Sequence, residues 1–125
     1  MDFWIEMLLV GLILPLGMFI FGIYCAGGGP KAVNWWFGYR SPRSKTNLDT
    51  WQFAHIYFGK LARVTWLIMI PITVVAMFLV RGHNNDFVFT YSVVLWGVQL
   101  AIVIVQIALT ERALRKTFDV NGLRL

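Results

Sequence analysis

Three long apolar runs alternate with polar segments along the chain. The first extends from about Phe3 to Cys25, the second from about Leu61 to Val80 and the third from about Phe87 to Leu109. Each has the roughly 20 residues that an α-helix needs to cross a bilayer. Glu6 lies near the start of the first run and Arg63 near the start of the second, and the third run has no charged residue. The pattern predicts an all-α integral membrane protein with three transmembrane helices in one domain that spans residues 1–125.

The polar segment between the first two runs, about residues 27–60, has a helical pattern of its own. Thr46 and Asp49 have the [ST]-x-x-[DE] spacing of a capping box, which predicts a helix start near Asn47. Apolar or aromatic side chains then recur at helical spacing, at Trp51, Ala54, His55, Phe58 and Ala62. We therefore expect an amphipathic interfacial helix that continues into the second transmembrane helix.

The composition excludes several classes of protein. The chain is 58% hydrophobic and only 14% charged, with a mean hydropathy of +0.67. A small domain has too little interior to bury so many apolar side chains. The sequence is therefore not that of a soluble enzyme, a disordered chain or a disulfide scaffold. The single cysteine, Cys25, has no partner for an internal disulfide, and we interpret it as a small apolar residue.

The positive charges indicate how the chain crosses the membrane. With three transmembrane helices, the loop at 27–60 and the tail at 110–125 lie on the same side. Arg81 is the only Lys or Arg on the other side. The remaining ten are Lys31, Arg40, Arg43, Lys45, Lys60, Arg63, Arg112, Arg115, Lys116 and Arg124. The positive-inside rule then predicts an inner-membrane protein with the N-terminus outside and the C-terminus in the cytoplasm. This topology, together with attraction to anionic headgroups of the membrane lipids, accounts for the net charge of +5.

Aromatic and basic residues are mixed in the segment from Trp35 to Arg43, and two interpretations stay open. The first is an interfacial belt of aromatic rings with snorkelling cations. The second is a pocket for an anion or a phospholipid headgroup, with forked donors from Arg40 and Arg43 and free N–H groups near Asn47. Nucleic acid is not an expected partner, because the loop is short and held against a membrane.

An ordered motif occupies the same loop. Asn34 is followed by the run from Gly38 to Ser44, GYRSPRS, then by Asn47 and by a W-x-x-A-[NH] segment from Trp51 to His55. This motif resembles the signature of the SdpI family of small bacterial membrane proteins. The resemblance implies immunity to a secreted antimicrobial peptide toxin, and relay of the toxin signal through a cytoplasmic regulator held at the membrane. The chain holds one three-helix unit and is shorter than the family's founder.

We expect the motif to contain the residues that bind a ligand or partner. They are Asn34, Gly38, Tyr39, Arg40, Pro42, Arg43, Ser44, Asn47, Asp49, Trp51 and His55. Gly38 permits a tight turn and Pro42 stiffens it, so that Arg40 presents its planar fork to a carboxylate or phosphate. The partner of Arg40 is either Asp49, the only acid in the loop, or a ligand. His55 lies on the apolar helix face, where a packed, hydrogen-bonded histidine is favoured over a proton relay.

No catalytic set, metal-spaced Cys/His cluster or phosphate-binding glycine motif is recognisable. We therefore predict a protein that is not an enzyme and has no cofactor and no metal. The favoured function is SdpI-like immunity to, or sensing of, a membrane-active antimicrobial peptide or envelope stress. Two alternatives remain: a membrane protein that binds the headgroup of a lipid or cell-wall precursor, and a structural subunit of a membrane complex.

Two glutamines in the third apolar run predict contacts between helices. Gln99 and Gln106 are seven residues apart and share one helix face. Polar side chains in a transmembrane helix usually bond to neighbouring helices, although a polar path for a substrate is the alternative. Together with Gly97 they suit close helix contact, which predicts a homodimer.

Overall fold

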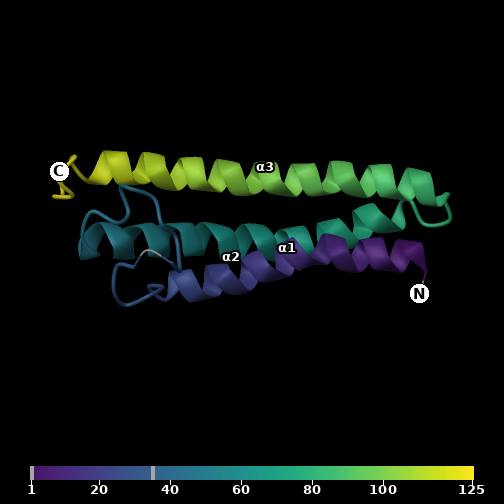
Figure 1. The fold of residues 1–125 in the computed structure, drawn as a ribbon, viewed down its shortest axis with the longest axis horizontal. Coiled ribbons are helices and arrows are strands. Elements are labelled where there is room, and N and C mark those ends of the chain that lie inside the picture. The colour runs from purple at the N-terminus through teal and green to yellow at the C-terminus, as the bar shows by residue number, and fades with distance from the viewer. Residues whose placement is uncertain (1, 35) are drawn as a thin grey trace.

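The computed structural model describes residues 2–34 and 36–125, which fold into three long helices (Figure 1). They are α1 (Phe3–Ala26), α2 (Leu48–Phe78) and α3 (Asn85–Thr117). The described residues contain no strand beyond an isolated bridge between Phe118 and Arg124. Each helix is long and apolar enough to cross a membrane. The predicted fold class is therefore confirmed.

The helices bring the loop and the tail to the same end of the molecule. The end of α1, the start of α2 and the end of α3 meet there, and we call it the loop end (Figure 1). The N-terminus and the connection between α2 and α3 lie at the opposite end. α1 packs most extensively on α2, and α3 contacts both.

Small residues allow α1 and α2 to approach closely near the loop end. A Cβ at Gly59 would overlap the backbone of Cys25 and Ala26, and a Cβ at Gly22 would lie 2.7 Å from the backbone nitrogen of Arg63. Glycine is favoured where helix backbones come this near in a membrane. Cys25 is fully buried at the crossing, which fits its interpretation as a small apolar residue.

Polar side chains link the helices in the apolar part of the bundle. Gln99 Nε2 of α3 donates to the carbonyl of Gly11 in α1 and to Thr73 Oγ1 in α2, both at 3.1 Å. Gln106 Oε1 accepts a hydrogen bond from Trp66 Nε1 at 3.0 Å. The predicted hydrogen bonds between neighbouring helices are thus confirmed. The homodimer stays a prediction.

The start of α2 differs by one residue from the predicted capping box. Asn47 is the N-cap: its side chain accepts from Thr50 N at 2.9 Å, and Thr50 Oγ1 accepts from Asn47 N at 3.1 Å. The assignment of the box to Thr46 and Asp49 was wrong. Asn is a better cap than Thr, and the hydroxyl of Thr50 makes the reciprocal bond that a Glu side chain usually makes.

Candidate functional site

The loop folds around the side chain of His55, which is fully buried. Gly29 has a φ of +65° and Gly38 a φ of +105°, values that L side chains rarely adopt. A Cβ at Gly29 would overlap the imidazole ring, and a Cβ at Gly38 would lie 2.7 Å from His55 Nε2. Both positions therefore require glycine for their backbone angle and for the space that the ring occupies.

Both ring nitrogens of His55 are used inside the protein. Nε2 accepts from the backbone N–H of Tyr39 at 2.9 Å, and Nδ1 lies 2.8 Å from the carbonyl oxygen of Trp51. A peptide N–H only donates, so Nε2 carries no proton and Nδ1 donates to Trp51. The indole of Trp51 in turn donates to the carbonyl of Pro30 at 2.9 Å. The packed, hydrogen-bonded histidine is confirmed, and its role is to hold the loop against α2.

Tyr39 links the loop to α3. Its side chain is buried, and its hydroxyl donates to Glu111 Oε1 at 2.7 Å. Burial raises the pKa of Tyr39 well above its usual value, and the hydrogen bond to the Glu111 carboxylate raises the pKa further. The tyrosine therefore stays protonated and continues to donate to Glu111.

The S-P-R-S part of the motif is a turn closed by its own serines. Ser44 Oγ accepts from Ser41 N at 2.9 Å, and Ser41 Oγ accepts from Ser44 N at 3.1 Å. Thr50 Oγ1 donates to the Ser44 carbonyl at 3.0 Å, which fastens the turn to the first turn of α2. Pro42 lies exposed at the tip of this turn.

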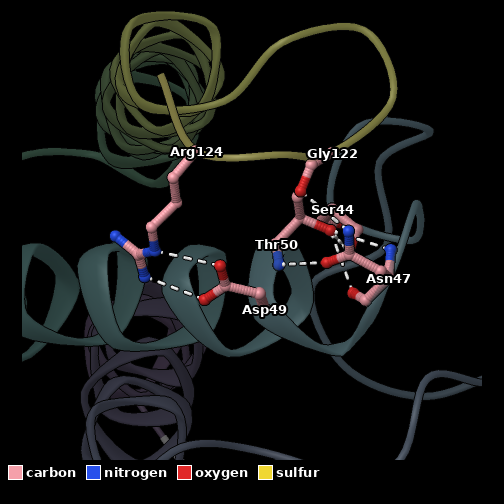
Figure 2. A network of polar contacts seen from close by, with 6 residues as sticks. All are labelled: Ser44, Asn47, Asp49, Thr50, Gly122 and Arg124. Carbon is pink, nitrogen blue, oxygen red and sulfur yellow. Dashed lines mark hydrogen bonds and ion pairs between the residues drawn. The ribbon is translucent and has the colours of Figure 1, made fainter.

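The C-terminal tail folds back onto the start of α2 (Figure 2). Asn47 Nδ2 donates to the carbonyl of Gly122 at 2.8 Å, and Arg124 binds the Asp49 carboxylate through two hydrogen bonds of 2.9 and 2.8 Å. Asp49 is therefore paired with Arg124, and the pair with Arg40 that the sequence left open does not form in the described chain. The tail also covers the helix start that the sequence suggested as an anion site.

The two arginines of the motif line different hollows. Arg40 is exposed and borders an open groove of about 310 Å³ between α1 and α3. Arg43 is half-buried and borders a much smaller hollow beside Thr50 and Phe118. The proposed headgroup pocket that combined both arginines with the start of α2 is therefore not assembled as expected. Of these two arginines, only Arg40 borders a hollow large enough for a ligand.

Two aromatic residues before Gly38, Trp36 and Phe37, are exposed. Trp36 is 69% exposed and Phe37 is 45% exposed, as an interfacial belt requires. Asn34 orders this stretch, because its Oδ1 accepts from Phe37 N at 2.7 Å and from Trp36 N at 3.1 Å. Trp35, which the belt interpretation includes, lies outside the described residues.

The predicted site residues thus divide by exposure. Tyr39, Ser44, Trp51 and His55 are buried and bonded within the protein, whereas Arg40, Pro42 and Asp49 are exposed. Their assignment as binding residues stays a prediction. Within residues 2–34 and 36–125, no group of three or more His, Cys, Asp and Glu side chains is placed to hold a metal ion.

Sequence reasoning missed the residues that fasten this loop from a distance: Gly29, Glu111, Gly122 and Arg124. Glu111 had one detectable signal, because it is the only acid near the C-terminal end of the third apolar run. No sequence signal indicated the contacts of Gly122 and Arg124, because a glycine and a cation in a polar tail are compatible with many conformations.

Comparison with protein families finds one match. The model of the SdpI/YfhL protein family matches residues 31–110, which include most of the loop, all of α2 and most of α3. No curated protein and no solved structure matches the chain.

Proposed function

The chain belongs to the SdpI/YfhL protein family, and on this premise we propose that it protects a bacterial cell against a membrane-active antimicrobial peptide, or senses such a peptide or the envelope stress that it causes. One observation from the fold supports this proposal above the others. The family-like motif is hydrogen-bonded to α2 and α3 and leaves Arg40 exposed. A preformed surface at one membrane face suits recognition, because little ordering entropy is lost when it binds.

The proposal includes an orientation. Ten of the eleven Lys and Arg residues belong to the loop, the tail and the halves of α2 and α3 nearer the loop end, so the positive-inside rule favours a cytoplasmic loop end and an outside N-terminus. In this orientation a peptide inserted in the bilayer meets the apolar faces of the helices, and the loop end is open to a cytoplasmic regulator.

Cysteine labelling tests the orientation. In a Cys25→Ala background, Lys45→Cys and His83→Cys place single thiols at two exposed positions of opposite ends. We expect an impermeant maleimide to label His83→Cys in intact cells and to label Lys45→Cys only after lysis. Labelling of Lys45→Cys but not of His83→Cys in intact cells would show the opposite orientation.

Peptide challenge tests the function. The gene is deleted in its host and expressed in a sensitive bacterium, and the minimal inhibitory concentration is measured for a panel of membrane-active peptides. We expect deletion to sensitise the host to at least one peptide, and expression to protect against the same peptide. Two results together would refute both immunity and sensing. Sensitivity would be unchanged across the panel, and the deletion strain would show the same transcriptional response to the peptides as the wild type.

A further inference from the structure

An open apolar groove runs between α1 and α3 at the loop end. Its volume is about 310 Å³, and its walls include Phe21 of α1 and Val103 and Ile107 of α3. Phe58 of α2 also lines it, and residues Gly38 to Ser41 of the loop border it beside Arg40. The groove is therefore apolar along the helices and basic at the end where the headgroup layer would lie.

The charges at the loop end leave Arg40 without an internal partner. Three acidic side chains lie there, and each is hydrogen-bonded to another group: Asp49 binds Arg124, Glu111 accepts from Tyr39, and Asp119 Oδ1 accepts from two backbone N–H groups of the tail. Among the residues that the structure describes, Arg40 makes no ion pair. An anion at its guanidinium would therefore displace no existing ion pair.

We propose that this groove binds an anionic phospholipid, with one acyl chain between α1 and α3 and the phosphate at Arg40. Apolar walls alone would not select one lipid, because all acyl chains are about as apolar as the side chains. Selection comes from the net charge of the headgroup: the guanidinium fork pairs with the phosphate oxygens, and an anionic headgroup has no cation of its own to neutralise them. Ser41 borders the same space beside Arg40.

This lipid site goes beyond the proposed function and does not depend on it. Immunity and sensing concern a peptide and are measured in cells. The lipid site concerns the purified chain and is measured without any peptide. Failure of the peptide challenge therefore leaves the lipid site standing, and the reverse is also true.

Native mass spectrometry of the purified full chain tests the proposal. The protein is exposed to equal amounts of phosphatidylglycerol and phosphatidylcholine with identical acyl chains. We expect the wild type to retain phosphatidylglycerol preferentially. In Arg40→Ala the ratio of retained phosphatidylglycerol to phosphatidylcholine should fall roughly tenfold, the effect expected from one charge-assisted contact. Arg112→Ala is the matched control, because Arg112 is an exposed cation at the same end that does not line the groove.

A second pair of variants tests the acyl-chain part of the site. Ile107 is 41% exposed and lines the groove, so Ile107→Trp should fill it and reduce retention of phosphatidylglycerol. Ile104→Trp is the control on the same helix, since Ile104 is 66% exposed and faces elsewhere. Thermal unfolding in detergent checks that each variant is folded, and Val103→Phe replaces Ile107→Trp if that variant does not fold.

Three outcomes would overturn the proposal. The first is unchanged preference in Arg40→Ala. The second is unchanged retention of phosphatidylglycerol in a folded groove-filling variant, which would show that no acyl chain occupies the groove. The third is displacement of phosphatidylglycerol by millimolar inorganic phosphate, which would indicate a site for free anions.

Discussion

The two sides of the motif loop differ in how their polar groups are used. On the inward side, both nitrogens of His55 are bonded, the Tyr39 hydroxyl is bonded, and two glycines touch the imidazole ring. On the outward side, Arg40 is exposed beside a groove and makes no ion pair within the described chain. The inward side therefore sets the conformation of the loop, and the outward side is the part left free to bind.

A large loss of stability is expected from Gly38→Ala. A side chain there meets both an unfavourable φ and the ring of His55, which together cost about 2–5 kcal/mol of unfolding free energy. Gly28→Ala is the matched control, because Gly28 has a similar φ of +112° but no atom within 4 Å of the added Cβ. Unfolding in detergent micelles measures both. Equal losses would show that backbone strain alone, and not the contact with His55, makes glycine necessary.

A smaller loss is expected when the acceptor of the Tyr39 N–H is removed. His55→Leu leaves that buried donor without a partner, which costs about 1–3 kcal/mol. His55→Gln should lose less, because its amide oxygen is able to accept the same N–H. His83→Leu, at an exposed position of the opposite end, should change the unfolding free energy by less than about 0.5 kcal/mol. If His55→Gln loses as much as His55→Leu, the hydrogen bond to Tyr39 is not what the loop needs.

The hydroxyl of Tyr39 predicts a dependence on pH. Its pKa is raised in the folded protein from the usual value of about 10. The folded state therefore holds this proton more tightly than the unfolded state, so the contribution is complete below about pH 10 and is lost as the pH rises above it. Tyr39→Phe should lower stability at neutral pH by about 1–2 kcal/mol and flatten the alkaline decline. An equally steep alkaline decline in Tyr39→Phe would assign it to other groups.

The smallest effect is expected at the exposed ion pair of the tail. The Arg124 and Asp49 side chains are 57% and 47% exposed, so water and salt screen their attraction. Arg124→Ala should shift the unfolding midpoint only slightly at low salt and not at all at high salt. A large shift that persists in high salt would mean that the tail holds the loop through more than this pair.

The sequence predicted most of the fold because the apolar runs match the thickness of a bilayer. The predicted spans at about Phe3–Cys25 and Phe87–Leu109 lie within α1 and α3 for that reason, although α3 extends past Leu109. Its last turns are polar, and Arg115 and Lys116 lie where cations favour a helix C-terminus. A search for apolar residues does not detect such turns.

The site was less predictable than the fold because its contacts join distant parts of the chain. The motif located the loop, and the spacing predicted a buried His55, since both are local signals. The pairing of Asp49 with Arg124 and of Tyr39 with Glu111 depends on how α3 returns to the loop end. No local sequence pattern predicts that α3 ends beside the loop, and so the sequence did not decide the partner of Arg40.

The most direct test of the account compares Arg40→Lys with Arg40→Ala in the peptide challenge. Lysine keeps the charge but not the fork, so we expect Arg40→Lys to lose protection almost as fully as Arg40→Ala. Lys31→Ala, an exposed cation of the same loop, should protect like the wild type at equal protein levels. If Arg40→Lys protects like the wild type, Arg40 contributes only a positive charge to protection, and the account of its guanidinium fork as the group that protection requires is wrong.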